Sequence, residues 1–365
     1  MPVRISPWTR LRRAFQYYRR HLKYRGERLL GHEFVPRHGV ITIEPSGLCN
    51  LACRFCGYPK KEHGRVVMPD EAFQSHVRQA VDLGYASISL TSSSGDLFMD
   101  KGIAAKLEFL ESHPGIADYK FYTNFVLPDR ETIQWLVGLK KLSLLMLSIY
   151  GHDEESFRAI AKRPKTAYDR LVANIEALAD LAPQGRVAVE IHPRTYRAFA
   201  WSPAEPERAG DSALIRAMRR LIRDGGAKWT GNWDSYDTWG GMVTPQDIGD
   251  LDLELADGRD VPRYGACKFL FDDPIVFADG VVNACACRGL DRSLAIGDLN
   301  KQTLREVLSP DNPVYRGILD RHIRSDYPET CKDCMTYRSI YRRPRGWPYI
   351  SLAEFFSRRE GRFRA

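Results

Sequence analysis

Residues 49–56 read Cys-Asn-Leu-Ala-Cys-Arg-Phe-Cys, and they place three thiols on one short stretch of chain. In this C-x3-C-x2-C spacing, Cys49, Cys53 and Cys56 can all turn toward one point on a tight loop. Three thiolates are one fewer than the four that close an iron–sulfur cluster, so one iron would stay open for a ligand from outside the chain. An open metal site is typical of catalysis. A zinc site or a disulfide loop is the alternative, although zinc usually takes four ligands and disulfides need a secreted chain.

This stretch resembles the signature of the radical S-adenosylmethionine (SAM) enzymes, which place an aromatic residue before the third cysteine, as Phe55 is placed here. In that family the open iron binds the amino and carboxylate groups of SAM. The resemblance therefore implies a SAM-binding [4Fe–4S] cluster on the three thiols, with Phe55 beside the cofactor. It implies that one electron from the reduced cluster splits SAM into methionine and a 5′-deoxyadenosyl radical. A flavodoxin- or ferredoxin-type protein is the implied electron donor.

From Gly39 onward, strand-like segments alternate with helical patterns. We expect strands at 40–44, 86–91, 119–123, 143–149, 187–192 and 229–233, and helices at 70–83, 101–112, 129–139, 165–181 and 211–223. Repeated β-α units indicate a parallel sheet with right-handed crossovers. The fold prediction is therefore α/β, a partial (β/α)6 TIM-like barrel, which the family resemblance also implies. Active sites of such barrels lie at the carboxyl ends of the strands, and Cys49 follows the first expected strand closely.

Residues after the later strands are the candidates for binding SAM. Ser94-Gly95-Asp96 follows the second strand, where family members often carry Gly-Gly-Glu with backbone carbonyls that accept from the SAM amino group. The resemblance places Gly95 and Asp96 in this part of the site, and the altered sequence leaves the role of the Asp96 side chain open; a surface turn is the alternative. Asn124 ends the third strand. Ser148 ends the fourth, at the position that bonds the SAM ribose in the family.

Two polar residues end the fifth strand region. Arg194 is a candidate partner of the SAM carboxylate, because a guanidinium fork suits a carboxylate; an ordinary surface arginine is the alternative. Of the nine histidines, His192 is the one expected at the barrel mouth. It is interpreted either as a structural hydrogen-bonding residue or as a substrate contact.

A second group of cysteines lies in the C-terminal third. A hairpin with its turn at Asp279-Gly280 is expected there, and the Gly280-x4-Cys285 spacing resembles the cysteine-rich SPASM and twitch extensions of radical SAM enzymes. The number of cysteines implies the shorter twitch form, with one auxiliary [4Fe–4S] cluster. Its implied ligands are Cys267, Cys285, Cys331 and Cys334. A zinc ribbon on the same four thiols is the alternative.

Cys287 is left over, two residues from Cys285. Three interpretations stay open: an inert buried thiol, a ligand in place of Cys285, or a catalytic hydrogen-atom donor. The third interpretation rests on the resemblance, because some radical SAM epimerases return hydrogen from a cysteine.

The formal net charge of +8 is concentrated at the ends of the chain. Residues 1–40 carry ten Lys and Arg against two Asp and Glu, and residues 337–365 carry eight against two, so the rest of the chain is net acidic. This distribution argues against nucleic-acid binding by the body of the protein. We expect a basic helical segment at 1–38, the barrel at 39–240, a twitch/SPASM-like domain at 241–336 and a basic aromatic tail at 337–365. Residues 240–266 read as a long polar connection and a candidate cover for the active site.

The N-terminal segment is expected to be helical over 7–30, with Leu11, Phe15, Tyr18 and Leu22 on one face. We expect that face to pack on the barrel, with a solvated basic face opposite. The alternative is peripheral contact of the basic tails with an anionic membrane surface. The C-terminal tail has similar chemistry, with aromatic residues at Trp347, Tyr349, Phe355, Phe356 and Phe363.

No stretch approaches the roughly 18 apolar residues of a membrane span, and arginines interrupt the N-terminus where a signal peptide would be apolar, so a cytoplasmic location is expected. The leading functional hypothesis is a radical SAM oxidoreductase or epimerase that removes a C–H hydrogen from a small polar substrate of the sugar or cyclitol type. The alternatives are maturation of a ribosomally made peptide, modification of a lipid-linked substrate at the membrane surface, and a non-catalytic zinc or iron–sulfur scaffold.

Overall fold

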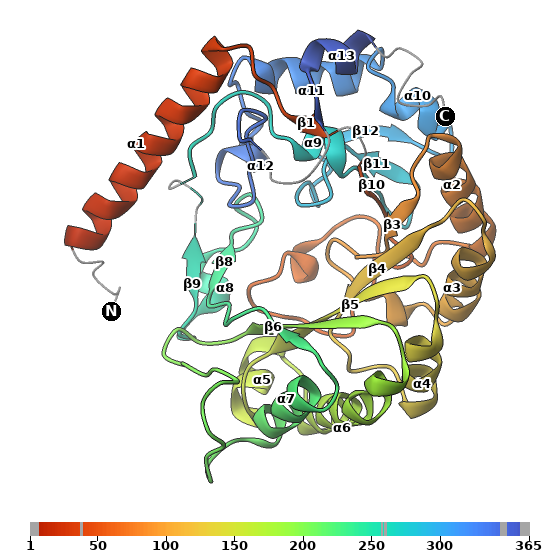
Figure 1. The fold of residues 1–365 in the computed structure, drawn as a ribbon, viewed down its shortest axis with the longest axis vertical. Helices are drawn as coiled ribbons and strands as arrows, with labels where there is room; N and C mark the ends of the chain where they lie inside the picture. The colour runs from red at the N-terminus through yellow and green to blue at the C-terminus, as the bar shows by residue number, and fades with distance from the viewer. Residues whose placement is uncertain (1–6, 37–38, 257, 259–260, 344–348, 358–365) are drawn as a thin grey trace.

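The computed structural model describes residues 7–36, 39–256, 258, 261–343 and 349–357, and it is organised around one nine-stranded sheet (Figure 1). The strand order is β12-β11-β10-β2-β3-β4-β5-β6-β7. The central strands pair in parallel from β2 through β7, which confirms the expected α/β barrel architecture. They are β2 (Ile41–Ile43), β3 (Ser87–Ser89), β4 (Asp118–Thr123), β5 (Leu142–Tyr150), β6 (Ala188–Arg194) and β7 (Lys228–Trp229).

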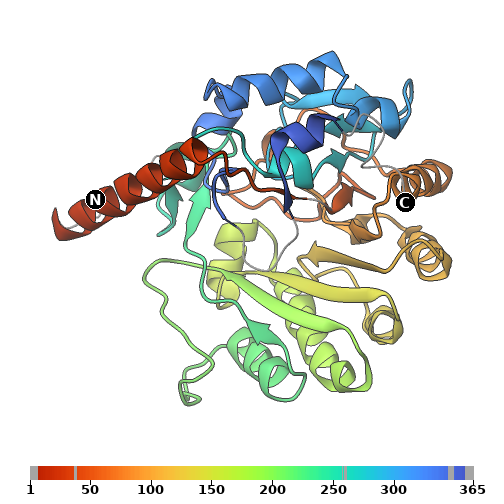
Figure 2. The same ribbon diagram turned by 45° about the horizontal axis from the view of Figure 1, so that its top comes forward.

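Helices cover the convex side of this sheet (Figures 1 and 2). The five expected helices are present as α2 (Asp70–Asp82), α3 (Ile103–Ser112), α4 (Arg130–Gly138), α6 (Lys165–Leu181) and α7 (Ala213–Arg223). A further helix, α5 (Glu154–Ala161), was not expected. Its local signal was Asp153, whose side chain accepts a hydrogen bond from the backbone N–H of Ser156 in a capping box. Short 3-10 turns lie at Tyr58–Lys60, Leu97–Met99 and Ala182–Gln184.

The two faces of the parallel sheet differ sharply in chemistry. Successive strand residues point to opposite faces. One set joins the hydrophobic core with the helices; it includes Ile41, Ile43, Ile88, Phe121, Leu145, Leu147, Val189 and Ile191. The other set faces the lumen of the barrel and is mostly polar; it includes Thr42, Ser89, Lys120, Tyr122, Ser148, Glu190, His192 and Arg194.

The C-terminal region continues the barrel sheet. β10 (Ile275–Val276) pairs in parallel with β2, and β11 (Val281–Asn283) and β12 (Ala295–Asp298) follow in antiparallel order. Four helices complete this region: α9 (Phe269–Asp272), α10 (Leu304–Leu308), α11 (Pro313–Ile323) and α12 (Glu329–Lys332). The expected hairpin at Asp279-Gly280 is therefore present, and it extends the open edge of the barrel. The expected domain boundary at residue 240 stays a prediction.

The connection between barrel and C-terminal region is more ordered than its composition indicated. β8 (Ser235–Asp237) pairs in parallel with β9 (Glu254–Ala256), and α8 (Pro245–Ile248) lies between them. This connection rests on residues 54–60. Arg54 donates to the carbonyl of Ile248 at 3.3 Å, and Lys60 pairs with Asp247 at 2.5 Å. The segment thus lies against the loop that carries the first three cysteines.

The N-terminal helix α1 (Pro7–Leu29) differs from expectation. We expected its apolar face to pack on the barrel, and that expectation was wrong: Leu11, Phe15, Tyr18 and Leu22 are each 62–66% exposed. The helix meets the body instead through its other side and its C-terminal half. β1 (Val35–Pro36) then pairs with β13 (Tyr349–Ile350), next to α13 (Leu352–Ser357).

In the C-terminal tail, Phe355 is buried in the core, while Trp347 and Phe363 lie outside the described residues. Among the described residues, none of the helices has the length and apolarity that a bilayer span requires.

Candidate functional site

The loop that carries Cys49, Cys53 and Cys56 leaves the carboxyl end of β2 and is anchored on α5. The backbone N–H groups of Ala52 and Arg54 donate to the carbonyls of Ala161 and Ile160, each at 3.1 Å. The last carbonyls of a helix have no partner inside that helix. The loop therefore supplies donors that the end of α5 needs, and the helix that sequence reasoning missed holds the three-cysteine loop in place.

The three thiols lie in a poorly hydrated environment. Cys53 is buried, and Cys49 and Cys56 are half-buried. The N–H of Leu51 points at Cys49 Sγ and that of Tyr58 at Cys56 Sγ, both at 3.4 Å. Burial raises the pKa of Cys49 to about 12 and raises the pKa of Cys53 and Cys56, with partial compensation from the charge of Arg194 on the last two.

This donor set fits an iron–sulfur cluster. Thiols with raised pKa values need a strong cationic partner to become thiolates, and backbone N–H···S bonds stabilise the thiolate form. Iron in a cluster supplies that partner, and three thiolates leave one iron open.

Phe55 connects the three-cysteine loop to residues 236–239, which follow the last parallel strand of the barrel. Its ring stacks on Tyr236, with centroids 4.0 Å apart and planes 14° from parallel, and it also lies near Tyr150. The carbonyl of Phe55 accepts a hydrogen bond from Trp239 Nε1 at 3.0 Å. Tyr236 and Trp239 escaped sequence reasoning because the segment around them has no clear periodicity.

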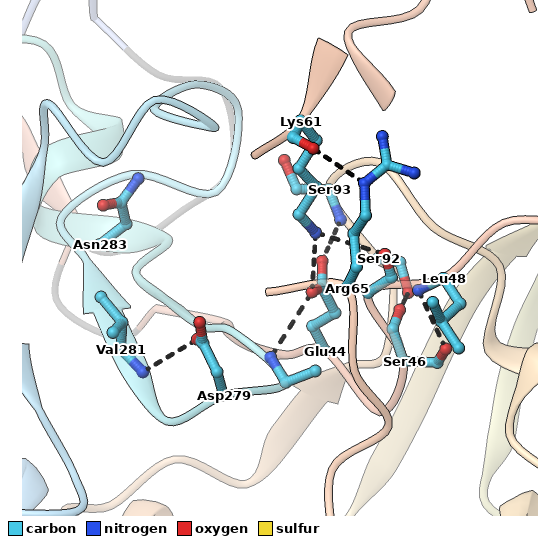
Figure 3. Close-up of polar contacts among 12 residues, drawn as sticks. Glu44, Ser46, Leu48, Lys61, Arg65, Ser92, Ser93, Asp279, Val281 and Asn283 are labelled. Carbon is cyan, nitrogen blue, oxygen red and sulfur yellow. Dashed lines mark hydrogen bonds and ion pairs between the residues drawn. The ribbon is translucent and has the colours of Figure 1, made fainter. Parts of the chain in front are cut away.

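A buried carboxylate ties the site to the C-terminal region. Glu44, directly after β2, has no exposed surface and accepts hydrogen bonds from three segments (Figure 3). Its partners are Lys61 Nζ at 3.4 Å, the N–H of Ser93 at 3.1 Å and the N–H of Ala278 at 3.5 Å. Burial raises the pKa of Glu44, and the Lys61 ammonium opposes that rise. Glu44 was not among the residues expected at the site. Its signal in the sequence was a charged residue at the end of an apolar strand.

Gly95 and Asp96 lie directly against the three-cysteine loop. A Cβ on Gly95 would come within 2.6 Å of the Ser46 carbonyl oxygen and 2.8 Å of that of Leu48, so glycine is required for this approach. The N–H of Asp96 donates to the Leu48 carbonyl at 2.7 Å. The observed approach is to the three-cysteine loop, and the expected contact of Gly95 with SAM stays a prediction.

The Asp96 side chain is used inside the protein. Its buried carboxylate accepts from the N–H of Phe98 at 3.0 Å, from Thr123 Oγ1 at 2.9 Å and from the N–H of Asn124 at 2.8 Å. It thereby joins the loop after β3 to the end of β4. These hydrogen bonds position the loop, and a contact of Asp96 with SAM stays a prediction.

Asn124 lies beside Cys49, and the charge of Arg194 acts on the other two thiols of the loop. Asn124 Nδ2 donates to Asn50 Oδ1 at 2.7 Å and lies 4.0 Å from Cys49 Sγ. The Arg194 guanidinium lies over the Trp233 ring, 5.0 Å from its centroid. Ser148 is buried at the end of β5, in register with His192 on β6. The SAM-binding roles of Asn124, Ser148 and Arg194 stay predictions.

The C-terminal thiols form a second group. The thiols of Cys267, Cys285, Cys331 and Cys334 are buried. Burial raises the pKa of Cys267 and of Cys331, and the charge of the nearby Cys334 thiol raises both further. Arg263 fastens this region by donating to the carbonyls of Cys331 at 2.9 Å and Cys334 at 2.8 Å. The four implied ligands therefore lie in one region of the structure, and their binding of an auxiliary cluster stays a prediction.

Cys287 joins this second group. Its thiol is within hydrogen-bonding reach of Cys285, which raises the pKa of Cys285 and lowers that of Cys287. Five thiols therefore meet where four ligands are needed, and Cys287 is half-buried where the others are buried. All three interpretations of Cys287, as an inert thiol, a ligand or a hydrogen-atom donor, stay open.

Among the described residues, no three or more His, Cys, Asp and Glu side chains converge on one metal ion. Cluster thiols need not converge in that way, because each binds a different iron.

Two family models match the chain at the positions of these two thiol groups. The radical SAM superfamily model matches residues 43–191, and the model of the SPASM iron–sulfur cluster-binding domain matches residues 267–335. The chain belongs to the radical SAM superfamily. This radical SAM enzyme therefore binds SAM and a [4Fe–4S] cluster, with auxiliary iron–sulfur binding in its SPASM domain.

Two structures of one protein, SuiB, show the same fold at low identity, and a structure of BtrN is similar more weakly. Streptococcus suis SuiB bound to precursor peptide SuiA is 16% identical with a TM-score of 0.53, covering 92% of this chain and 78% of that one. SuiB bound to SAM is 17% identical with a TM-score of 0.50, covering 93% and 80%. BtrN in complex with SAM and 2-DOIA is 13% identical with a TM-score of 0.49, covering 83% and 96%. No curated protein sequence matches the chain.

Replacing Lys61 with Met should destabilise the radical SAM enzyme by about 3–5 kcal/mol, because it leaves Glu44 as a buried carboxylate without its cation. Urea unfolding measures this change, and iron per chain should fall with it. The matched control is Lys60→Met, which breaks only the exposed pair with Asp247 and should cost at most about 1 kcal/mol. Equal stability of the two variants would contradict the assigned role of Glu44.

Replacing Cys285 with Ser should remove the auxiliary cluster and about half of the iron of the reconstituted protein, whereas Cys287→Ser should keep all of it. Iron analysis and electron paramagnetic resonance after anaerobic reconstitution measure both variants. The reverse pattern would assign Cys287 as the ligand in place of Cys285.

Proposed function

We propose that this radical SAM enzyme removes a C–H hydrogen atom from a small polar substrate of the sugar or cyclitol type, giving dehydrogenation or epimerisation. The observation that carries this proposal is the polar lumen. TIM-barrel interiors are ordinarily packed with branched apolar side chains. Here the inward strand positions include Ser89, Tyr122, Ser148, Glu190 and His192. Polar side chains in a lumen favour a ligand with several hydroxyl or amino groups.

The chemistry begins at the three-cysteine loop. When bound there, the reduced cluster and SAM supply a 5′-deoxyadenosyl radical that takes a hydrogen atom from carbon. We propose that residues around the three-cysteine loop hold SAM. Gly95 and Asn124 would contact it beside Cys49, and Arg194 would contact it near the other thiols. We propose a flavodoxin- or ferredoxin-type electron donor and a reducing, cytoplasmic environment.

His192 is our proposed substrate contact. Its Nε2 lies 3.2 Å from Glu190 Oε2, and Glu190 pairs with Lys228 at 2.7 Å. Burial lowers the pKa of His192, so the ring is neutral near pH 7. Because the Glu190 carboxylate can only accept a hydrogen bond, the proton of the neutral ring lies on Nε2, and Nδ1 is left as a hydrogen-bond acceptor. Nδ1 is buried and has no hydrogen-bond partner among the described residues, so a substrate hydroxyl would satisfy it.

Two outcomes are compatible with this lumen. Loss of one electron and one proton after hydrogen abstraction would oxidise an alcohol carbon to a carbonyl. Return of a hydrogen atom from Cys287 Sγ to the opposite face would invert the carbon instead, leaving a thiyl radical that one electron and one proton restore to the thiol. In our proposal an auxiliary cluster on Cys285 would lie next to Cys287. The electron of the first route would pass to this cluster and the electron of the second would come from it, and water would exchange the protons.

The test uses the anaerobically reconstituted full chain with SAM, dithionite and carbon-deuterated sugars, cyclitols and aminoglycosides. We expect deuterium to appear in 5′-deoxyadenosine with a member of this panel, and mass spectrometry measures it. The matched control is the same substrate deuterated only on oxygen and nitrogen, which should transfer none. Transfer from deuterated peptides alone would contradict the proposed substrate class, and a protein that leaves SAM intact would contradict the chemistry itself.

His192→Asn should lower kcat/KM for the substrate by about 5- to 150-fold, the range expected for a lost buried hydrogen bond of 1–3 kcal/mol. Substrate-independent cleavage of SAM should stay unchanged. In the parent protein, substrate-dependent activity should fall as the pH drops through the lowered pKa of His192, because protonation of Nδ1 removes the hydrogen-bond acceptor. The activity of His192→Asn should not show this decrease at low pH. The control is His113→Ala at the end of α3. A variant with unchanged kcat/KM and pH profile would contradict the role.

A further inference from the structure

Helix α1 carries an apolar stripe that the described residues of the protein leave exposed. Along Pro7–Leu29, large apolar side chains recur every three or four residues, and each is more than 60% exposed. The stripe consists of Trp8, Leu11, Phe15, Tyr18 and Leu22. Figures 1 and 2 show α1 as a rod at the periphery of the fold, with its N-terminal end farthest from the sheet. Scattered exposed apolar residues are ordinary, but a continuous stripe marks an interaction surface.

A different side of α1 joins the body. Tyr24 is buried, the His21 ring lies 5.3 Å from the Tyr264 ring, and Arg28 donates to the Tyr264 hydroxyl at 3.5 Å. At 100° per residue, these contacts and the stripe lie about 120° apart around the helix axis. The exposed stripe is therefore separate from the face that docks the helix.

The remaining surface of α1 is strongly basic. Residues 7–29 contain eight Lys and Arg and only one acidic residue, Glu27. Arg12, Arg19 and Lys23 are exposed, and they follow one another along the third side of the helix. Apolar and aromatic residues on one side with Lys and Arg on another are typical of helices that lie in the plane of a membrane surface.

We propose that α1 docks the radical SAM enzyme on an anionic phospholipid surface, with the stripe in the headgroup region and the basic side chains beside lipid phosphates. Charge complementarity indicates which partner binds the stripe. A second copy of this chain would bring two helices of like charge together, which opposes pairing through the stripe. A lipid surface offers both an apolar layer and negative charge. This inference is independent of the proposed substrate, although it would place a lipid-linked form of that substrate within reach.

The experiment is co-sedimentation of the full reconstituted chain with vesicles of phosphatidylcholine, with or without phosphatidylglycerol. We expect binding only to the anionic vesicles, weakening as salt shortens the Debye length from about 10 Å at 0.1 M to about 3 Å at 1 M. Arg19→Gln with Lys23→Gln should lower the partition coefficient about thirtyfold, at roughly 1 kcal/mol for each charge. Phe15→Asp should abolish binding.

The matched control is Val314→Asp, which adds the same charge at an exposed apolar residue of α11 and should bind as the parent does. Iron content and SAM cleavage are measured on the same samples. They distinguish a variant that has lost only vesicle binding from one that has lost its clusters or its activity. Absence of binding, or equal binding to neutral vesicles, would overturn the proposal. Dimers in light scattering that Phe15→Asp makes monomeric would assign the stripe to a second copy. Equal binding to soluble polyglutamate would assign the helix to an acidic protein.

Discussion

The arrangement of this site depends on one buried carboxylate. A carboxylate without solvent is costly unless a cation and hydrogen-bond donors surround it. Glu44 meets this need with Lys61, the N–H of Ser93 and the N–H of Ala278. These partners come from the end of the three-cysteine loop, the loop after β3 and the C-terminal hairpin. The same interaction therefore fixes three segments against one another: the three-cysteine loop, the loop after β3 and the edge where the SPASM region joins the barrel.

The surroundings of the three-cysteine loop serve to keep it fixed and shielded from water. Its N–H groups bind the end of α5, glycine at position 95 lets the next loop approach, and Asp96 locks that loop to β4. Above it, Phe55 stacks on Tyr236. Closure of this kind protects reactive intermediates from side reactions, which is a requirement for radical chemistry. In the function that we propose, the polar lumen orients the substrate, because a radical reacts with the C–H bond that is held nearest to it.

Charge is distributed unevenly between the two ends of the chain and the body of the protein. The body is net acidic and carries the buried site, whereas the first forty residues are strongly basic. Packing in the core explains the sheet and helices α2 to α7, but it leaves the apolar stripe of α1 unexplained. That stripe contributes nothing to the described core, so it reads as a surface for a partner, distinct from the catalytic part of the chain.

The sequence by itself determined the family, the barrel and both thiol groups. These signals are local: C-x3-C-x2-C, Gly280-x4-Cys285 and alternating β-α patterns each lie within a short stretch and need no knowledge of distant contacts. The tertiary structure decided what depends on distant partners. It committed the Asp96 carboxylate to the end of β4, placed Cys287 beside Cys285 and joined Glu44 to Ala278 across more than half of the chain. It also turned the apolar face of α1 to solvent, because periodicity shows which residues share a helix face but not which face meets the body.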